Sequence, residues 1–113
     1  MALECTISEL GTARVACIVG RVDSATAGAL EKSLTPLFDT PGRHAIVDLT
    51  ALDYISSAGL RIVLMAAKRA KQAQARLVLC GMAPHVREVF EISGFLKILE
   101  VANDQASAQA LLA

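Results

Sequence analysis

Two neighbouring serines offer the clearest chemical handle in this chain. The stretch DYISSAGLRIVL, residues 53–64, places Ser56 and Ser57 directly before a segment whose apolar residues recur at helical spacing. We expect Ser57 to be the helix N-cap, because its oxygen could accept a hydrogen bond from the amide of Gly59 or Leu60, a contribution of about 0.5–2 kcal/mol relative to alanine. The same place exposes the hydroxyl at the positive end of the helix dipole, where a phosphate would be stabilised by about 0.3–1 kcal/mol. Ser57 is therefore either a structural cap or a phosphorylation site, and Ser56, which has no helix amide so well placed, is the second choice.

The helix that follows has one face for the core and one for solvent. At about 100° per residue, the core side carries apolar residues: Leu60, Val63, Leu64, Ala67 and Ala70. The opposite side carries Ser57, Arg61, Met65, Lys68, Arg69 and Gln72. Met65 is the large apolar residue among these solvent-facing positions, so it is either an isolated surface residue or a contact for a partner protein. Arg61 lies one turn from Ser57 on the same face and could attract a phosphate there.

Other residues capable of catalysis or metal binding do not form a recognisable site. His44 and His85 fall in different elements, and neither has a metal ligand four residues away. The sequence contains neither a GxxxxGK phosphate loop nor a GxSxG nucleophile elbow. Cys5, Cys17 and Cys80 lie far apart with no CxxC pair, so we expect small apolar side chains in strands rather than a disulfide framework or a zinc site. The sequence therefore favours a protein that is not an enzyme and that needs no cofactor.

Composition narrows the class of protein further. The chain of 113 residues, 1–113, is long enough for one domain with a core of its own. Eleven basic residues balance eleven acidic ones, which argues against direct binding to nucleic acid or to an anionic membrane. No apolar run approaches the ~20 residues of a membrane span, and Glu4 stands where a secretory signal would carry positive charge. We therefore expect a cytoplasmic protein without membrane insertion.

Five segments have the composition of strands. The alternating LECTISEL, residues 3–10, and the more apolar ARVACIVG, residues 13–20, predict a hairpin of an edge strand and a buried strand. HAIVDL, residues 44–49, and ARLVLCG, residues 75–81, are short and almost continuously apolar, as in strands covered on both faces. LKILEV, residues 96–101, predicts the last strand.

Four helices are predicted between and after these strands. Their expected limits are a cap at Asp23 or Ser24 for the first, residues 57–74 for the second, Pro84 to Gly94 for the third, and a cap at Asn103 or Asp104 for the last. The resulting order, β-β-α-β-α-β-α-β-α, has helices crossing over between buried strands. The sequence therefore predicts an α/β fold with a mixed four- to five-stranded sheet packed by about four helices.

This order of elements, together with three stretches of sequence, resembles the STAS domain family, and within it the bacterial anti-sigma factor antagonists. The stretches follow the opening hairpin and read GRVDSATAGAL (20–30), HAIVDLTALDYISSAGLRIVL (44–64) and ARLVLCGMAPHVREVFEISGF (75–95). With the hairpin they cover residues 3 to about 101. The resemblance implies a single STAS domain over residues 1–113.

The resemblance also implies a mechanism and its partners. The serine two residues before the Gly-Leu pair, Ser57 here, is phosphorylated in the family by a partner that is both a serine kinase and an anti-sigma factor. The unphosphorylated antagonist binds that partner and frees the sigma factor, and a PP2C-type phosphatase resets the phosphorylated form. Asp23 matches an acidic position beside the phosphorylation site, although it could simply cap the first helix. Gly59 and Arg61 are the other expected neighbours of the phosphorylated residue.

The chain departs from the family pattern next to that serine. Many members have Asp just before the phosphorylated serine and a hydroxyl residue just after it, whereas this chain has Ser56 and Ala58. Losing the carboxylate removes a negative charge from the place where phosphate would arrive, and gives a kinase a second hydroxyl. An alternative role for the same fold is that of a STAS subunit of an ABC-type lipid transporter or of a stress-signalling assembly, without a phosphorylation switch.

The exposed flank of the second helix is the predicted partner surface. We expect it to contain Ser57, Arg61, Met65 and Lys68. A phosphate adds about 1.5–2 negative charges, which would have to be desolvated on binding. We therefore expect phosphorylation to exclude the partner locally, without changing the fold.

Overall fold

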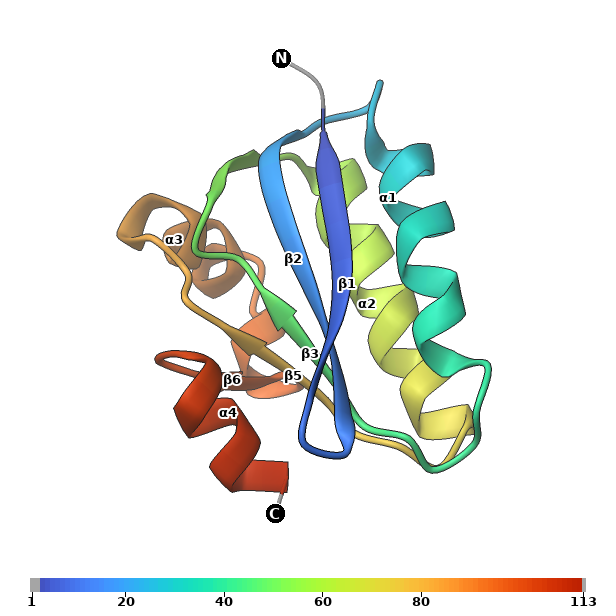
Figure 1. Ribbon diagram of the computed structural model, residues 1–113. Helices are drawn as coiled ribbons and strands as arrows, with labels where there is room; N and C mark the ends of the chain where they lie inside the picture. The colour runs from blue at the N-terminus through green and yellow to red at the C-terminus, as the bar shows by residue number, and fades with distance from the viewer. Residues whose placement is uncertain (1–2, 113) are drawn as a thin grey trace.

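The computed structural model describes residues 3–112 as one mixed β-sheet with helices on both faces (Figure 1). Its strands are β1 (Glu4–Leu10), β2 (Ala13–Val22), β3 (Ala45–Asp48), β4 (Leu52–Ile55), β5 (Leu77–Cys80) and β6 (Glu100–Ala102). Its helices are α1 (Ala27–Leu34), α2 (Ser57–Gln72), α3 (Pro84–Ile92) and α4 (Gln105–Leu112), with the 3-10 turns η1 (Thr35–Phe38) and η2 (Phe95–Lys97). The α/β class and the four helices confirm the prediction, and one strand more than expected is present.

The sheet order is β1-β2-β3-β5-β6, and β4 pairs with the far end of β2. The hairpin β1–β2 is antiparallel, whereas β3, β4, β5 and β6 run parallel to their neighbours. The central strand β3 is buried along Ala45–Val47, and β5 is buried along its whole length. These strands read as continuous apolar runs because helices cover them from both sides.

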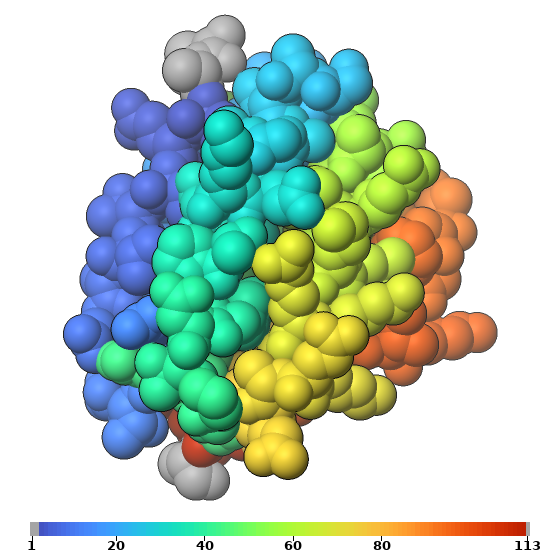
Figure 2. All heavy atoms as spheres, turned by 90° about the vertical axis from the view of Figure 1, so that its right-hand side faces the viewer, coloured from blue at the N-terminus to red at the C-terminus, as the bar shows by residue number. Residues whose placement is uncertain are grey.

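Within the described residues, three helices cover one face of the sheet and α4 alone covers the other (Figure 1). The larger core cluster joins the strands to α1, α2 and α3, and Phe90, Leu30 and Val63 are among its fully buried side chains. The smaller cluster joins β2, β3 and β5 to Ala108 of α4. On the first face α1 and α2 lie side by side at the surface (Figure 2). Among residues 3–112, no helix combines the length and the apolar character that crossing a membrane requires.

The strand that the sequence pattern did not reveal is β4. Buried and exposed residues do not alternate along this strand, since Leu52 and Ile55 are buried while Asp53 and Tyr54 between them are both exposed. A period of two is the usual signature of a half-buried strand, and this segment lacks it. β4 pairs in parallel with the end of β2, where the register shifts between Gly20 and Arg21. Its role is to carry the chain from β3 to the start of α2.

The first helix begins later than predicted and is followed by a 3-10 turn. α1 starts at Ala27 with Thr26 at the N-cap, so the expectation that Asp23 or Ser24 caps it is wrong. Its apolar spacing continues through Leu37 and Phe38, but these residues lie in η1. Pro36 has no N–H to donate to the preceding turn, which explains why the α-helix gives way at Thr35.

The last strand also begins later than predicted. The first two residues of the LKILEV segment lie in the 3-10 turn η2, Phe95–Lys97, and pairing with β5 begins only at Glu100. Gly94 has a φ of +79° and ends α3, as its residue type predicted. At the final helix Asp104 Oδ1 accepts a hydrogen bond from the amide of Ser107 at 2.8 Å, which confirms one of the two expected caps.

A polar cluster fastens α4 to the otherwise bare face of the sheet. Asp48, at the end of β3, accepts hydrogen bonds from the hydroxyl and amide of Thr50 at 2.6 and 2.9 Å. Its other oxygen accepts one from Gln105 Nε2 of α4 at 2.6 Å. Partial burial alone would raise the pKa of Asp48, but the bonds from Thr50 and Gln105 outweigh it and hold the pKa below its ordinary value. The carboxylate is therefore kept charged, and it links the sheet to α4.

The three cysteines lie in strands β1, β2 and β5, as predicted, and all are free thiols. Cys80 is fully buried, and burial, with a smaller effect of nearby Asp48, raises its pKa to about 12. A thiol with so high a pKa is almost entirely protonated near neutral pH and is a poor nucleophile. Its environment fits the small apolar role that the sequence indicated.

Gly81 generates a stability prediction, because no side chain fits at this position. Its φ is +76°, and an added Cβ would lie 2.1 Å from Thr50 Oγ1 and 3.2 Å from the Thr50 amide nitrogen. We expect Gly81→Ala to lower the free energy of unfolding by about 1–3 kcal/mol, through backbone strain and loss of the Thr50–Asp48 bond. Urea denaturation followed by circular dichroism measures this.

The matched control is Gly28→Ala in α1. A Cβ at Gly28 would meet nothing within 4 Å. Because alanine is the better helix former, this variant should gain up to about 1 kcal/mol. Equal stabilities for the two variants would contradict the role assigned to Gly81.

Candidate functional site

The start of α2 is held tightly against the ends of β2 and β4. Val22 and Ile55 are the last paired residues of these two strands. Beyond them the amide of Ser56 donates a hydrogen bond to the carbonyl of Val22 at 2.8 Å. Gly59 is buried on these side chains, and a Cβ on it would lie 2.6 Å from Val22 Cγ1 and 2.7 Å from Ile55 Cγ1. A glycine is therefore needed for this approach, which fixes where both serines stand.

Ser56, and not Ser57, is the N-cap of α2. Ser56 has extended backbone angles, φ −90° and ψ 174°, and its hydroxyl accepts a hydrogen bond from the amide of Gly59 at 3.3 Å. Its carbonyl accepts one from the amide of Leu60 at 2.9 Å. The expectation that Ser57 caps the helix is thus wrong by one residue, because pairing with Val22 keeps the chain extended through Ser56. The helix can begin only after that bond.

Ser57 is the first residue of α2, and its side chain is exposed. Within residues 3–112 its hydroxyl makes no hydrogen bond, whereas that of Ser56 is half-buried and engaged in the cap. Amide groups in the first turn of a helix lack intrahelical partners and carry partial positive charge. The free hydroxyl therefore stands at a helix end that favours negative charge.

Strand pairing brings the backbone of Asp23 next to that of Ser56. It follows Val22 just as Ser56 follows Ile55, so the chain leaves two adjacent parallel strands at neighbouring positions. Its carboxylate accepts hydrogen bonds from the amides of Ala25 and Thr26 at 2.9 and 3.1 Å. The side chain thus forms an Asx turn that leads into α1, rather than capping the helix itself.

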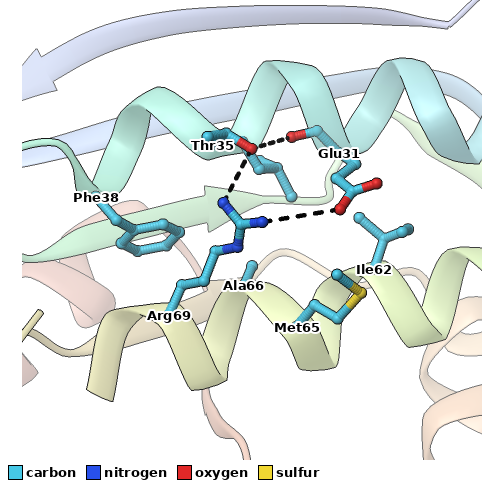
Figure 3. A pocket seen from close by; sticks show the side chains of 8 residues that line it. Glu31, Thr35, Phe38, Ile62, Met65, Ala66 and Arg69 are labelled. Atoms are coloured by element: carbon cyan, nitrogen blue, oxygen red, sulfur yellow. Dashed lines mark hydrogen bonds and ion pairs between the residues drawn. The ribbon is translucent and has the colours of Figure 1, made fainter. Parts of the chain in front are cut away.

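The outer flank of α2 is mainly basic. Ser57, Arg61, Lys68, Arg69 and Gln72 are exposed, as the helical spacing predicted. Within the part of the chain that the structure describes, neither Arg61 nor Lys68 takes part in an ion pair. Arg69 lies 3.9 Å from Glu31 and donates a hydrogen bond to Thr35 Oγ1 at 3.4 Å, which ties α2 to α1 (Figure 3). On this flank, the cations that a partner can reach without breaking an ion pair are therefore Arg61 and Lys68.

Met65 does not stand free in solvent as expected. It is half-buried and lines a groove between α1 and α2 together with Phe38, Ile62 and Arg69 (Figure 3). The free volume there is about 10 Å³, enough for roughly one water molecule and too small for a ligand. Met65 therefore packs partly between helices, and only part of its side chain can contact a partner.

The buried face of α2 is also rotated relative to the prediction. Leu60, Val63 and Ala70 are buried as expected, but Leu64 and Ala67 are only half-buried, and Ala66 is buried instead. The reason is α1, which lies alongside α2 and covers its Ala66 side. The spacing of Ile62 and Ala66, four residues apart, was the available signal for this second contact.

Two contacts near the site have no counterpart in the sequence analysis. The guanidinium of Arg21 lies 4.5 Å from the ring centroid of Tyr54, its partner across the β2–β4 pair. His85 Nε2, at the start of α3, is 2.5 Å from the carbonyl oxygen of Asp53. Both contacts depend on β4, so they could not be expected before that strand was known.

Comparison with known proteins identifies the family of this chain and several of its relatives. The sequence model of the STAS domain matches residues 6–108. The chain belongs to the STAS family. This STAS chain is 50% identical over 108 residues to BtrV of Bordetella bronchiseptica, a candidate anti-sigma factor antagonist, with 96% of this chain and 93% of BtrV covered. It is 33% identical over 86 residues to the anti-sigma-B factor antagonist of Listeria monocytogenes, with 76% and 75% covered.

A solved structure agrees with the fold of the STAS chain. The crystal structure of an anti-sigma factor antagonist from Mycobacterium paratuberculosis superposes with a TM-score of 0.86 at 20% identity, covering 98% of this chain and 94% of that one. The STAS chain is thus a homologue of anti-sigma factor antagonists, which are regulators and not enzymes. The predicted family, fold and non-enzymatic class are confirmed.

The position of the cap yields a test that separates the two serines. We expect Ser56→Ala to lower the free energy of unfolding by about 0.5–2 kcal/mol, because it removes the bond to the Gly59 amide. Ser57→Ala should change it by less than about 0.5 kcal/mol, because its hydroxyl is exposed and unbonded. Urea denaturation of both variants measures the difference, and a larger loss for Ser57→Ala would show that Ser57 is the cap after all.

Proposed function

We propose that this chain, as one STAS domain over residues 1–113, is an anti-sigma factor antagonist switched by phosphorylation of Ser57. In the unphosphorylated form it binds an anti-sigma factor that is also a serine kinase, and the sigma factor is released. A PP2C-type phosphatase reverses the modification. The proposal implies a cytoplasmic protein, since bacterial transcription takes place there. The observation that supports it most is the exposed, unbonded hydroxyl of Ser57 at the first position of α2.

The local geometry favours Ser57 over Ser56 as the phosphate acceptor. A kinase must reach the hydroxyl oxygen and remove its proton, and the oxygen of Ser56 is half-buried and bonded to the Gly59 amide. Phosphorylating Ser56 would also require the cap to rearrange. Ser57 needs no such change, because its side chain projects from the helix surface.

The folded domain can accommodate the phosphate without rearrangement. The dianion would stand at the positive end of α2, with Arg61 one turn along the same flank. The carboxylate predicted beside the site, that of Asp23, accepts hydrogen bonds from the amides of Ala25 and Thr26. The positive end of the helix and Arg61 favour the added negative charge, so the switch acts at the surface.

Partner release then follows from desolvation. A phosphate carries about 1.5–2 negative charges, and burying them against a partner costs free energy unless cations there compensate. Each 1.4 kcal/mol of that cost weakens binding about tenfold. Two such units give a hundredfold change, which is enough to dissociate a complex at ordinary protein concentrations. The fold itself need not respond.

The modified residue is tested with a candidate anti-sigma factor kinase and Mg-ATP. We expect mass spectrometry to find one phosphate on the wild-type chain and on Ser56→Ala, and none on Ser57→Ala. Ser56→Ala serves as the matched control, since it keeps the exposed hydroxyl. Phosphate persisting on Ser57→Ala would move the site to another residue. Stable association with a membrane ATPase, and no phosphate on any variant, would support the alternative of a transporter subunit.

The contact surface is tested by calorimetry with the same anti-sigma factor. We expect Arg61→Glu and Lys68→Glu each to weaken binding at least about tenfold, because both cations are exposed and unpaired on the flank that carries Ser57. Met65→Asp should weaken it too, but it also disturbs packing against α1, so its fold must be checked by circular dichroism. Lys97→Glu, the same charge change on exposed η2, is the control. Equal losses of affinity in all four variants would contradict a binding surface on α2.

A further inference from the structure

The first strand, β1, is an open edge of the sheet. It pairs with β2 on one side, and within residues 3–112 no strand lies on its other side. Five of its seven residues are exposed. In Figure 2 the dark blue atoms of β1 form the left border of the molecule, with no other element outside them. An edge of this kind presents unpaired N–H and C=O groups to any strand that can approach.

The hairpin turn determines which backbone groups point outward. Gly11 has a φ of +62° and Thr12 does not have a positive φ, which is the pattern of a two-residue type II′ turn. In such a hairpin the residues flanking the turn, Leu10 and Ala13, exchange both hydrogen bonds, and bonded pairs then recur at every second position. The groups that face away from β2 are therefore those of Cys5, Ile7 and Glu9.

The other side of β2 supports this assignment independently. The amide of Arg14 donates to His44 O at 3.1 Å, and the amide of Gly20 donates to Ala51 O at 3.1 Å. The backbone N–H and C=O groups of the even-numbered residues of β2 thus point toward β3 and β4, and those of the odd-numbered residues point toward β1. Arg14 is the partner of Glu9 in the hairpin register. Glu9 and its alternate neighbours accordingly direct their backbone groups to the free edge.

β1 lacks most of the features that protect a natural edge strand. These features are proline, charged side chains and above all lysine, bulges, and very short length. β1 contains neither proline nor lysine, it is seven residues long, and its register with β2 runs without a shift. At its centre Ile7 is apolar and 42% exposed. One of its two carboxylates, Glu9, is paired with Arg43 of its own chain. The strand can therefore accept a neighbour.

We propose that two copies of this chain associate through antiparallel pairing of their β1 strands, with the twofold axis at Ile7. This register brings each residue opposite a residue of the second copy: Ile7 with Ile7, Cys5 with Glu9, Thr6 with Ser8, and Glu4 with Leu10. It is the register in which the outward-facing groups of Cys5, Ile7 and Glu9 all find partners, each pair exchanging two N–H···O bonds. No like charges stand directly opposite.

The strand's own sequence argues for a second copy as the occupant. A shift of the axis by one residue in either direction leaves a strand end unpaired, and a shift by three brings Glu4 onto Glu4. Full overlap is thus reached in a register in which no carboxylates face each other. Standard stable interfaces bury at least about 1,200 Å² in total, and a single pair of strands buries less than this. We therefore expect the dimer to be weak. It shares no residue with the start of α2, which stays open in both copies.

The experiment is sedimentation velocity of the full chain at loading concentrations from about 10 µM to about 1 mM, the range of weak association. We expect the weight-average mass of wild type to rise from that of a monomer toward that of a dimer. Ile7→Lys should stay monomeric throughout. The matched control is Val19→Lys, since Val19 is 38% exposed but lies on β2, away from the edge, and it should dimerise like wild type.

Amide hydrogen exchange on the wild-type chain tests the proposed register of the two β1 strands without the use of a variant. At high concentration the amides of Cys5, Ile7 and Glu9 should gain protection, while those of Thr6 and Ser8, already bonded to β2, should not change. Circular dichroism checks that each variant is folded. The proposal is overturned by a wild-type monomer at every concentration, by a dimer that persists in folded Ile7→Lys, or by protection that appears away from β1.

Discussion

The contact on which the rest of the site depends is that of Gly59 with Val22 and Ile55. A side chain at Gly59 would overlap both residues, so only a glycine lets the first turn of α2 rest on the ends of β2 and β4. The approach in turn aligns the amide of Ser56 with the carbonyl of Val22. That bond keeps Ser56 extended and makes it the cap, which leaves the next hydroxyl outside. One missing methyl group thus determines which serine is structural and which is accessible.

The two faces of the sheet are held by different kinds of interaction. The face under α1, α2 and α3 is a large apolar core, and burial of side chains such as Phe90 and Leu30 supplies most of its stability. The face under α4 has a smaller apolar cluster and depends more on directed bonds. Asp48 binds Gln105, and Arg76 reaches both Glu100 and the carbonyl of Leu111. The docking of α4 is therefore specified by polar contacts as well as by its short apolar side.

Most of the fold could be predicted because its signals are local. Continuous apolar runs marked β3 and β5, Pro84 and Gly94 marked the ends of α3, and Asp104 marked the start of α4. The features that were predicted wrongly or not at all depend on contacts between distant segments. β4 lacks a strand period and is recognisable only by its pairing with β2. The cap of α2 moved by one residue for the same reason, and Met65 proved half-buried because α1 lies beside it.

The link between β3 and α2 illustrates how the fold constrains its own evolution. β4 pairs with β2 over only Leu52–Ile55, and the helix begins two residues after that strand ends. Adding or removing one residue here would turn the strand's side chains to the opposite face and rotate α2 by about 100° on the sheet. Homologues should therefore vary the chemistry of residues 50–58 far more readily than their number. Insertions should collect instead in the surface loop before β3, where Gly42 has open space around it.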